Sequence, residues 1–493
     1  MIATKGRSSS RFPLGASLAL ALMIGLLPSI SAQGPDRAVP PQLGPPPSLR
    51  LPPIDRRTLS NGLPVWVVEL HKVPVAAVSL LVRSGSSADP AGKFGAATLT
   101  AAMLDGGAGG RSSLEIADEI DYLGASLSTG SSFDASVIRL QVPVARLQAA
   151  LPIMADVVLR PTFPDRELER LRQERLTALL QTRDNPSALI SMAFPRLVYG
   201  LTHRYGTPAF GTAETVRALT AADLRAFHGG HYRPDNAVLI VAGDVTAGGV
   251  LPLLESAFGA WKPAGGGIAA PSLPDVGPIK ARQVFLVDKP GAAQSQIRIG
   301  WIGVPRVTPD YFPLEILNTI LGGSFMSRLN QNLREQHGYT YGAMSTFDMR
   351  RSAGPFYAAA GVQTDKTAEA LKEFFNELNG IVKPPSSDEV ERAKNYIALG
   401  FPGEFETTGD LSRRLEELFI YDLPPDYFST YVERIRAVRP EDVHQAAQKH
   451  IRPDRFAVVI VGDASKVRAP VEALKLGPLK MMTVTDLLGP ATP

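Results

Sequence analysis

The chain of 493 residues contains no cysteine. This absence excludes disulfide bonds and thiolate metal sites, and it excludes a bacterial lipoprotein, which needs a cysteine to carry its lipid. The chain also lacks a strong excess of charge, with a formal net charge of +3 at pH 7. Lys5, Arg7 and Arg11 lie in the first 33 residues, which contain no acidic residue, so the remainder is close to neutral. This composition gives no reason to expect nucleic acid or a membrane surface as a partner.

Several motifs of enzyme chemistry are missing as well. There is no nucleophile elbow, phosphate-binding loop or dinucleotide-binding fingerprint. Among seven histidines, only His228 and His231 are close together, and the two glycines between them indicate a helix end rather than a rigid ligand face. Because a tetrahedral zinc site normally needs three or four protein ligands, we interpret this pair as structural.

The first 33 residues have the pattern of an export signal. Basic residues precede an apolar run of 14 residues, Leu14 to Leu27, and the small residues Ser29, Ser31 and Ala32 follow it. The run is too short to span a bilayer as a helix. We expect a signal peptide over 1–33 and a periplasmic mature protein, with an uncleaved anchor as the alternative.

Proline and glycine divide the rest of the chain. Residues 34–54 are rich in proline and are expected to form an extended arm. Residues 263–278 combine three consecutive glycines with four prolines, a composition typical of a linker. The flanking segments 55–262 and 279–475 are each long enough for a core of their own, and 476–493 remains as a tail.

The two long segments are copies of each other. Residues 217–244 align without gaps on residues 436–463. His231 pairs with His450, and Arg-Pro-Asp recurs at 233–235 and 452–454. In both copies a Pro-Asp turn precedes an apolar run, 237–242 or 456–461, which indicates a buried strand. We therefore predict two homologous domains.

Hydrophobic periodicity in the first copy predicts strands that alternate with helices. Strands are expected at 65–70 and 75–83, and Ser112 with Glu115 has the spacing of a capping box. This pattern fits a sheet covered by helices, α/β or α+β, with strand order undetermined. Helices are expected at 96–104, 113–123, 144–158, 164–183, 187–199 and 213–228.

The most informative stretch is 321–341 in the second copy. Gly322 and Gly323 permit a tight turn and close backbone approach. Met326, Leu329 and Leu333 have helical spacing, which predicts a short amphipathic helix, and Gly338 is placed to end it. Two side chains here can bind a peptide carboxylate or carbonyl: the guanidinium of Arg334 and the hydroxyl of Tyr341. From the residues alone, a structural interpretation is favoured, in which Arg334 is a helix-end arginine and Tyr341 is a half-buried tyrosine.

Arg-Glu-Gln-His-Gly-Tyr-Thr-Tyr at 334–341, after Gly-Gly-Ser-Phe, resembles the second domain of insulinase-like (pitrilysin-type) zinc metallopeptidases. The resemblance extends from about Leu59 to about Asp463 and is closest to the two-chain bacterial members. It implies an α+β, sandwich-like fold in which each domain is a largely antiparallel sheet covered by helices, the two forming half of a clamshell. It also implies that Arg334 and Tyr341 hold substrate beside a zinc ion bound elsewhere, and we include Gly322 and Gly323 among the predicted substrate-binding residues.

An active member of this family carries His-x-x-Glu-His on the first helix, where the histidines bind zinc and the glutamate activates water. Thr98, Ala101 and Ala102 stand at these positions. The distal glutamate ligand falls at Thr177 or Ala178, and the nearest carboxylate, Glu174, is about one helical turn away. Threonine and alanine do not hold zinc, so we expect no metal, no cofactor and no catalytic residue in this chain.

The loss of every ligand beside a retained Arg334–Tyr341 pair leads to one main hypothesis. The chain would be a non-catalytic, substrate-orienting subunit of an exported zinc metallopeptidase that acts on peptides. Its partner would be a homologue with His-x-x-Glu-His, which would bind the zinc. The alternative is a stand-alone peptide-binding or assembly protein with the same fold and no peptidase activity. An intact homologue encoded beside this chain would favour the first. A free-standing peptidase with a relocated site is the third hypothesis, and it lacks a replacement ligand set.

Overall fold

The computed structural model describes residues 51–262, 273, 274 and 276–490. The predicted signal segment, most of the proline-rich arm and most of the linker lie outside these residues. The described part of 263–278 carries no helix or strand. No helix among the described residues has both the length and the apolar character needed to cross a membrane.

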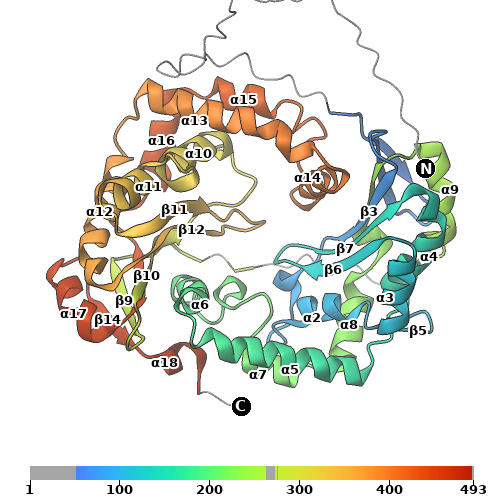
Figure 1. The fold of residues 1–493 in the computed structure, drawn as a ribbon, viewed down its shortest axis with the longest axis horizontal. Helices are drawn as coiled ribbons and strands as arrows, with labels where there is room; N and C mark the ends of the chain where they lie inside the picture. Colours follow the sequence, from blue (N-terminus) through green and yellow to red (C-terminus); the bar gives the residue numbers. More distant parts are fainter. Residues whose placement is uncertain (1–50, 263–272, 275, 491–493) are drawn as a thin grey trace, which may run out of the picture. The chain divides into compact units, whose positions relative to one another are not determined.

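The first domain is built on a six-stranded sheet in the order β1-β2-β8-β3-β7-β6 (Figure 1). β2 and β8 are parallel, and every other pair is antiparallel. The strands are β1 (Asp55–Thr58), β2 (Pro64–Glu69), β3 (Val75–Val82), β6 (Ser126–Ser131), β7 (Ser136–Pro143) and β8 (Ala237–Gly243). A short ribbon of β4 (Gly107–Ala108) and β5 (Arg111–Ser112) stands apart from this sheet.

The second domain repeats this sheet in the order β11-β12-β10-β13-β9-β14. Reading inward from the edge strands β6 and β11, five strands follow the same succession in both sheets, which confirms the predicted duplication. Here β9 is parallel to both β13 and β14, and the other pairs are antiparallel. The strands are β9 (Gln283–Asp288), β10 (Gln294–Ile302), β11 (Thr340–Phe347), β12 (Pro355–Gln363), β13 (Ala457–Gly462) and β14 (Leu479–Met482).

Most predicted helices of the first domain are found. The Ser112–Glu115 capping box forms at the start of α3. The prediction of one helix over 213–228 is wrong, because Leu219 is extended and Thr220 caps a new helix with its side chain. The helices are α2 (Ala96–Met103), α3 (Ser113–Tyr122), α4 (Leu147–Leu159), α5 (Asp165–Thr182), α6 (Pro186–Tyr199), α7 (Ala213–Ala218), α8 (Ala221–His231) and α9 (Ala247–Phe258).

The second domain carries more helices, and they extend into the segment predicted as a tail. That segment supplies β14 and α18, and Leu487 of α18 is fully buried. The helices are α10 (Tyr311–Asn318), α11 (Arg328–Asn330), α12 (Thr367–Gly380), α13 (Ser387–Gly400), α14 (Thr408–Ile420), α15 (Tyr431–Ala437), α16 (Pro440–His450), α17 (Ala464–Ala473) and α18 (Val484–Leu488).

The two domains exchange one helix each. α14 of the second domain packs on β3 and β8 of the first, and Leu415, Leu81 and Ile240 belong to one apolar core. Conversely, α6 of the first domain packs on β10 and β13 of the second, and Phe194 shares a core with Val459. Since strand side chains alternate, the opposite face of each sheet is covered by helices of its own domain.

Candidate functional site

The glycine pair of the second domain lies in a π-helical turn over Thr319–Gly323 that follows α10. A Cβ atom on Gly322 would lie 2.2 Å from the backbone nitrogen of Ser345 in β11. A Cβ on Gly323 would lie 2.7 Å from the Asn318 side-chain nitrogen. The predicted close backbone approach is therefore present, and it presses this turn against the edge strand of the sheet.

The segment after the glycines is helical, but its first predicted residue lies outside the helix. α11 begins at Arg328 and continues as a wider π-helical turn over Gln331–Gln336. Leu329 and Leu333 are fully buried, whereas Met326 is 73% exposed because it precedes the first turn. Including Met326 in the apolar face was wrong. Gly338 has φ of 65° and ends the helix as predicted. Turns of the π type occur frequently at functional sites.

Arg334 lies in this π-helical turn, and two neighbours orient its side chain. The guanidinium lies over the Phe325 ring, 4.4 Å from the ring centroid, and its Nε is 3.3 Å from the Glu335 carboxylate. About a third of the side chain, 35%, remains exposed. The cation–π contact restricts the side chain while leaving donors free to reach a ligand.

Tyr341 is placed by a β-bulge at the start of β11. The pairing of β11 with β12 shifts between Thr340 and Ala343, so that Tyr341 and Gly342 fall in the irregularity. Bulges re-aim side chains next to functional sites. Tyr341 is 91% exposed, the largest exposure of any large apolar or aromatic side chain among the described residues. The phenol is thus presented to solvent and is not part of a core.

Asn330 connects these two elements and was not predicted. It is buried, its Nδ2 donates to the Phe325 carbonyl at 2.7 Å, and its Oδ1 accepts from the Ala343 backbone N–H at 3.2 Å. Phe325 supports Arg334, and Ala343 follows the bulge that carries Tyr341. One side chain therefore fixes the supports of both predicted substrate-binding residues.

Exposed apolar side chains lie on the same two segments as this pair. Phe325, Met326, Tyr341 and Met344 are all exposed, and they come from one loop and the adjacent edge strand. We call these residues together with Arg334 the Arg–Tyr corner. Exposed apolar groups of this kind mark sites that contact another molecule.

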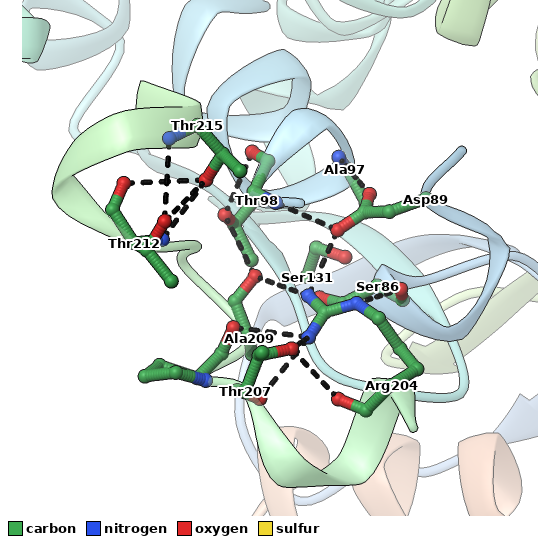
Figure 2. Close-up of polar contacts among 12 residues, drawn as sticks. Ser86, Asp89, Ala97, Thr98, Ser131, Arg204, Thr207, Ala209, Thr212 and Thr215 are labelled. Atoms are coloured by element: carbon green, nitrogen blue, oxygen red, sulfur yellow. Dashed lines mark hydrogen bonds and ion pairs between the residues drawn. The ribbon is translucent and has the colours of Figure 1, made fainter. Parts of the chain in front are cut away.

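In the first domain, a buried ion pair holds the helix that corresponds to the metal-binding helix of active relatives. The Asp89 carboxylate accepts from the backbone N–H groups of Gly95 and Ala97, each at 2.7 Å, and so caps α2 (Figure 2). Arg204 donates to the same carboxylate at 2.8 Å. Both side chains are almost completely buried, and desolvation raises the pKa of Asp89 despite these contacts.

Arg204 also forms hydrogen bonds to two loops beside the Asp89 carboxylate. Its Nε donates to the Ser86 carbonyl at 2.7 Å, and its other nitrogens donate to Thr207, Pro208 and Ala209 (Figure 2). All these acceptors lie outside helices and strands except Ser86, which opens a short 3-10 turn. No sequence pattern marks Asp89 or Arg204, because the partners lie far apart in the chain.

The residues at the zinc-ligand positions cannot form the family's metal site. Ala101 is fully buried, Ala102 is half-buried, and the Thr98 hydroxyl donates to the Gly95 carbonyl at 3.1 Å. Thr177 and Ala178, the predicted distal positions, are exposed. Among the described residues, no group of three histidines and carboxylates is arranged to hold a metal ion. Two methyl groups and a hydroxyl that is already engaged do not fit zinc.

An arginine contacts this position in place of a ligand. The Nη1 of Arg175, on α5, donates to the Thr98 Oγ1 at 3.0 Å. Glu174, which precedes it, is exposed and pairs with Arg170 at 3.3 Å, so it does not approach α2. Burial lowers the pKa of Arg175 to about 10, and the group remains cationic at neutral pH.

Each of the two close histidines has a hydrogen-bond partner within the first domain. His228 Nε2 lies 2.8 Å from the Val158 carbonyl, and His231 Nδ1 lies 3.0 Å from the Ser84 hydroxyl. Burial lowers the pKa of both imidazoles, which favours their neutral forms.

Known proteins share this fold and parts of this sequence. The family model described as Insulinase (Peptidase family M16) matches residues 65–203, and the model described as Peptidase M16 inactive domain matches residues 218–397. An uncharacterized zinc protease of Streptomyces coelicolor is 27% identical over 410 residues, covering 80% of this chain and 86% of its own. One from Mycobacterium leprae is 28% identical over 345 residues, covering 70% and 76%.

Solved structures extend the comparison. The crystal structure of a peptidase M16 inactive domain from Pseudomonas fluorescens has a TM-score of 0.77 and 28% identity, covering 83% of this chain and 98% of its own. A protease from Helicobacter pylori, at 22% identity, has the same fold with a TM-score of 0.78, covering 84% and 100%.

The duplicated mixed sheets and the arrangement of α2 and α5 define a metallopeptidase-type fold whose metal-ligand positions hold residues that do not bind zinc. The chain belongs to the insulinase family, peptidase family M16.

Proposed function

We propose that this chain is the non-catalytic, substrate-orienting subunit of an exported, two-chain zinc metallopeptidase. One observation carries the proposal: the zinc-ligand positions are replaced, while the Arg–Tyr corner is intact and presented to solvent. A tyrosine that is 91% exposed contributes little to the core, so its place on a bulge near an oriented arginine supports a role in binding.

Peptide binding at the Arg–Tyr corner follows from its chemistry. The Arg334 guanidinium can donate to a carbonyl or carboxylate, and the Tyr341 hydroxyl can donate a second hydrogen bond. The exposed apolar side chains beside them suit peptide side chains. Orienting a peptide supplies a large part of a rate acceleration without any contact to the metal. The partner would be a homologue with His-x-x-Glu-His and would contribute the zinc and the activated water.

The test is a reconstituted pair of this chain with such a homologue. Arg334→Ala removes a charge-assisted hydrogen bond and should lower kcat/KM roughly 10- to 100-fold, since such bonds contribute about 1.5–3 kcal/mol. Tyr341→Phe should lower it less, unless its oxygen stabilises the tetrahedral intermediate, in which case kcat falls more than KM rises.

Matched controls are Arg468→Ala and Tyr396→Phe, which alter exposed side chains of other helices. Zinc content and association should be unchanged in all four variants. Full activity per complex in both corner variants would remove the proposal and leave a stand-alone peptide-binding protein as the better account. Export is tested separately, because N-terminal sequencing should find the mature chain beginning near Gln33 or Gly34.

A further inference from the structure

The guanidinium of Arg175 lies where α5 meets α2, the two helices on which the resemblance to active family members would place the metal ligands. It is held there by Thr98, which stands at the position of the first histidine ligand. The protein thus places a positive charge of its own at a point where the family places a metal cation. Both kinds of cation attract carboxylates and polarised carbonyl oxygens.

The hydrogen-bonding capacity of Arg175 is mostly unused. A guanidinium has five N–H donors in a planar fork. Within the described part of the chain, the Thr98 hydroxyl is its one hydrogen-bond partner, and no carboxylate lies within 4.0 Å of it. The nearest acidic groups are engaged elsewhere, Asp89 with Arg204 and Glu174 with Arg170.

The surroundings make an unpaired cation unfavourable. Arg175 is half-buried, and burial lowers its pKa, which shows that the charged form loses solvation. Buried charges in proteins are normally paired. Asp89 and Glu174 are the negative charges that act on Arg175, and each already pairs with another arginine, so a bound anion would give Arg175 a partner of its own.

We propose that Arg175, oriented by Thr98, is a carboxylate-binding point for a peptide, either for its C-terminal carboxylate or for an Asp or Glu side chain. The two parallel N–H groups of an arginine match the two oxygens of a carboxylate. This inference rests on the proposed peptide-binding function but concerns a different domain from the Arg–Tyr corner. It gives the first domain a role in choosing substrates after the loss of its metal.

The test compares labelled peptides that differ only in one carboxylate. One pair has a free or an amidated C-terminus, and a second pair has Glu or Gln at an internal position. The wild-type chain should bind the acid form of one pair about tenfold more tightly than the neutral form. Arg175→Gln should abolish this ratio while leaving the affinity for the neutral peptide unchanged.

The control is Arg170→Gln, on the same helix, whose exposed side chain pairs with Glu167 and Glu174. It should keep the full acid-to-neutral ratio. Thr98→Val, which removes only the hydroxyl that orients the guanidinium, should reduce the ratio severalfold, and it keeps the test valid if Arg175→Gln unfolds. In the reconstituted pair, the same ratio is read from KM.

A ratio near one in the wild-type chain, or a ratio that survives Arg175→Gln, would overturn the proposal and assign Arg175 to packing alone. These results are independent of the Arg–Tyr corner, whose failure would appear as unchanged turnover in the Arg334 and Tyr341 variants. A difference between the free and the amidated peptide identifies the bound group as a C-terminal carboxylate. A difference between the Glu and the Gln peptide identifies it as an acidic side chain.

Discussion

Substitution of Asn330 by alanine should separate positioning of the Arg–Tyr corner from general stability. The change removes both hydrogen bonds of the side chain, to Phe325 and to Ala343, and leaves a part-buried carbonyl and a buried N–H without a partner. At about 1 kcal/mol for each bond, with a further term for the unsatisfied groups, the free energy of unfolding should fall by about 2–3 kcal/mol. Because the two domains share apolar cores and should unfold together, the melting temperature should fall by only about 2–4 °C.

A matched control lies two residues away. Asn332 is also buried, but its side chain donates to Glu373 and Glu377 on α12, at 3.0 and 2.7 Å. Asn332→Ala should therefore destabilise the domain to a similar degree without moving Phe325 or Ala343. Comparison of Asn330→Ala with Asn332→Ala therefore separates the effect of displacing Phe325 and Ala343 from the effect of lower stability.

Two measurements distinguish the variants. Amide hydrogen exchange at 341–343 should accelerate in Asn330→Ala and stay near wild type in Asn332→Ala. In the reconstituted pair, kcat/KM should fall about tenfold or more only for Asn330→Ala, since small displacements of orienting groups reduce rates strongly. Equal activity in the two variants at a temperature where both are folded would refute the reasoning.

Three further predictions concern the metal, the buried ion pair and pH. The purified chain should hold no stoichiometric zinc after dialysis, and about one tightly bound zinc per chain by metal analysis would contradict this. Arg204→Met leaves the Asp89 charge buried without its partner and should lower stability by about 3–5 kcal/mol in urea unfolding, whereas Arg468→Met, an exposed pair with Glu472, should change it by less than about 0.5 kcal/mol. Burial raises the pKa of Glu315 from 4.5 to about 7, so the contribution of this carboxyl to stability favours folding below pH 4.5 and is lost as the pH rises through 7. Glu315→Gln should therefore stabilise the protein by up to about 3 kcal/mol at pH 8 and by much less at pH 5. An equal gain in stability at both pH values would show that the carboxyl is not responsible.

Local features were predicted well because short-range patterns determine them. The buried strand at 237–242, the capping box at Ser112 and the helix end at Gly338 each depend on neighbouring residues, and the duplication was visible as an aligned segment. The division of 213–228 was missed although Thr220 and Asp223 have capping-box spacing, a signal that the helical periodicity across this segment obscured. The apolar spacing placed Met326 on the buried face of the helix. It could not show that the helix begins only at Arg328, after Met326.

Short-range sequence patterns could not predict the contacts that build the two sites. Asn330, Arg204 and Arg175 act through partners that are distant in the sequence or that offer only backbone atoms. Thr177 and Ala178, the positions predicted for the distal ligand, are exposed, and Arg175 of the same helix donates to Thr98 of α2. An arginine within a charged helix carries no mark of its orientation.

The exchange of α6 and α14 has a consequence for how the polypeptide reaches its native state. The sheet of the first domain can form early, but its face at Leu81 and Ile240 stays open until α14, near the far end of the chain, is available. Neither half can therefore be isolated as a stable fragment without exposing a large apolar surface, which is prone to aggregation. For this chain the smallest unit that folds is the whole pair of domains, and a break in the connecting segment would be tolerated only if both pieces remained together.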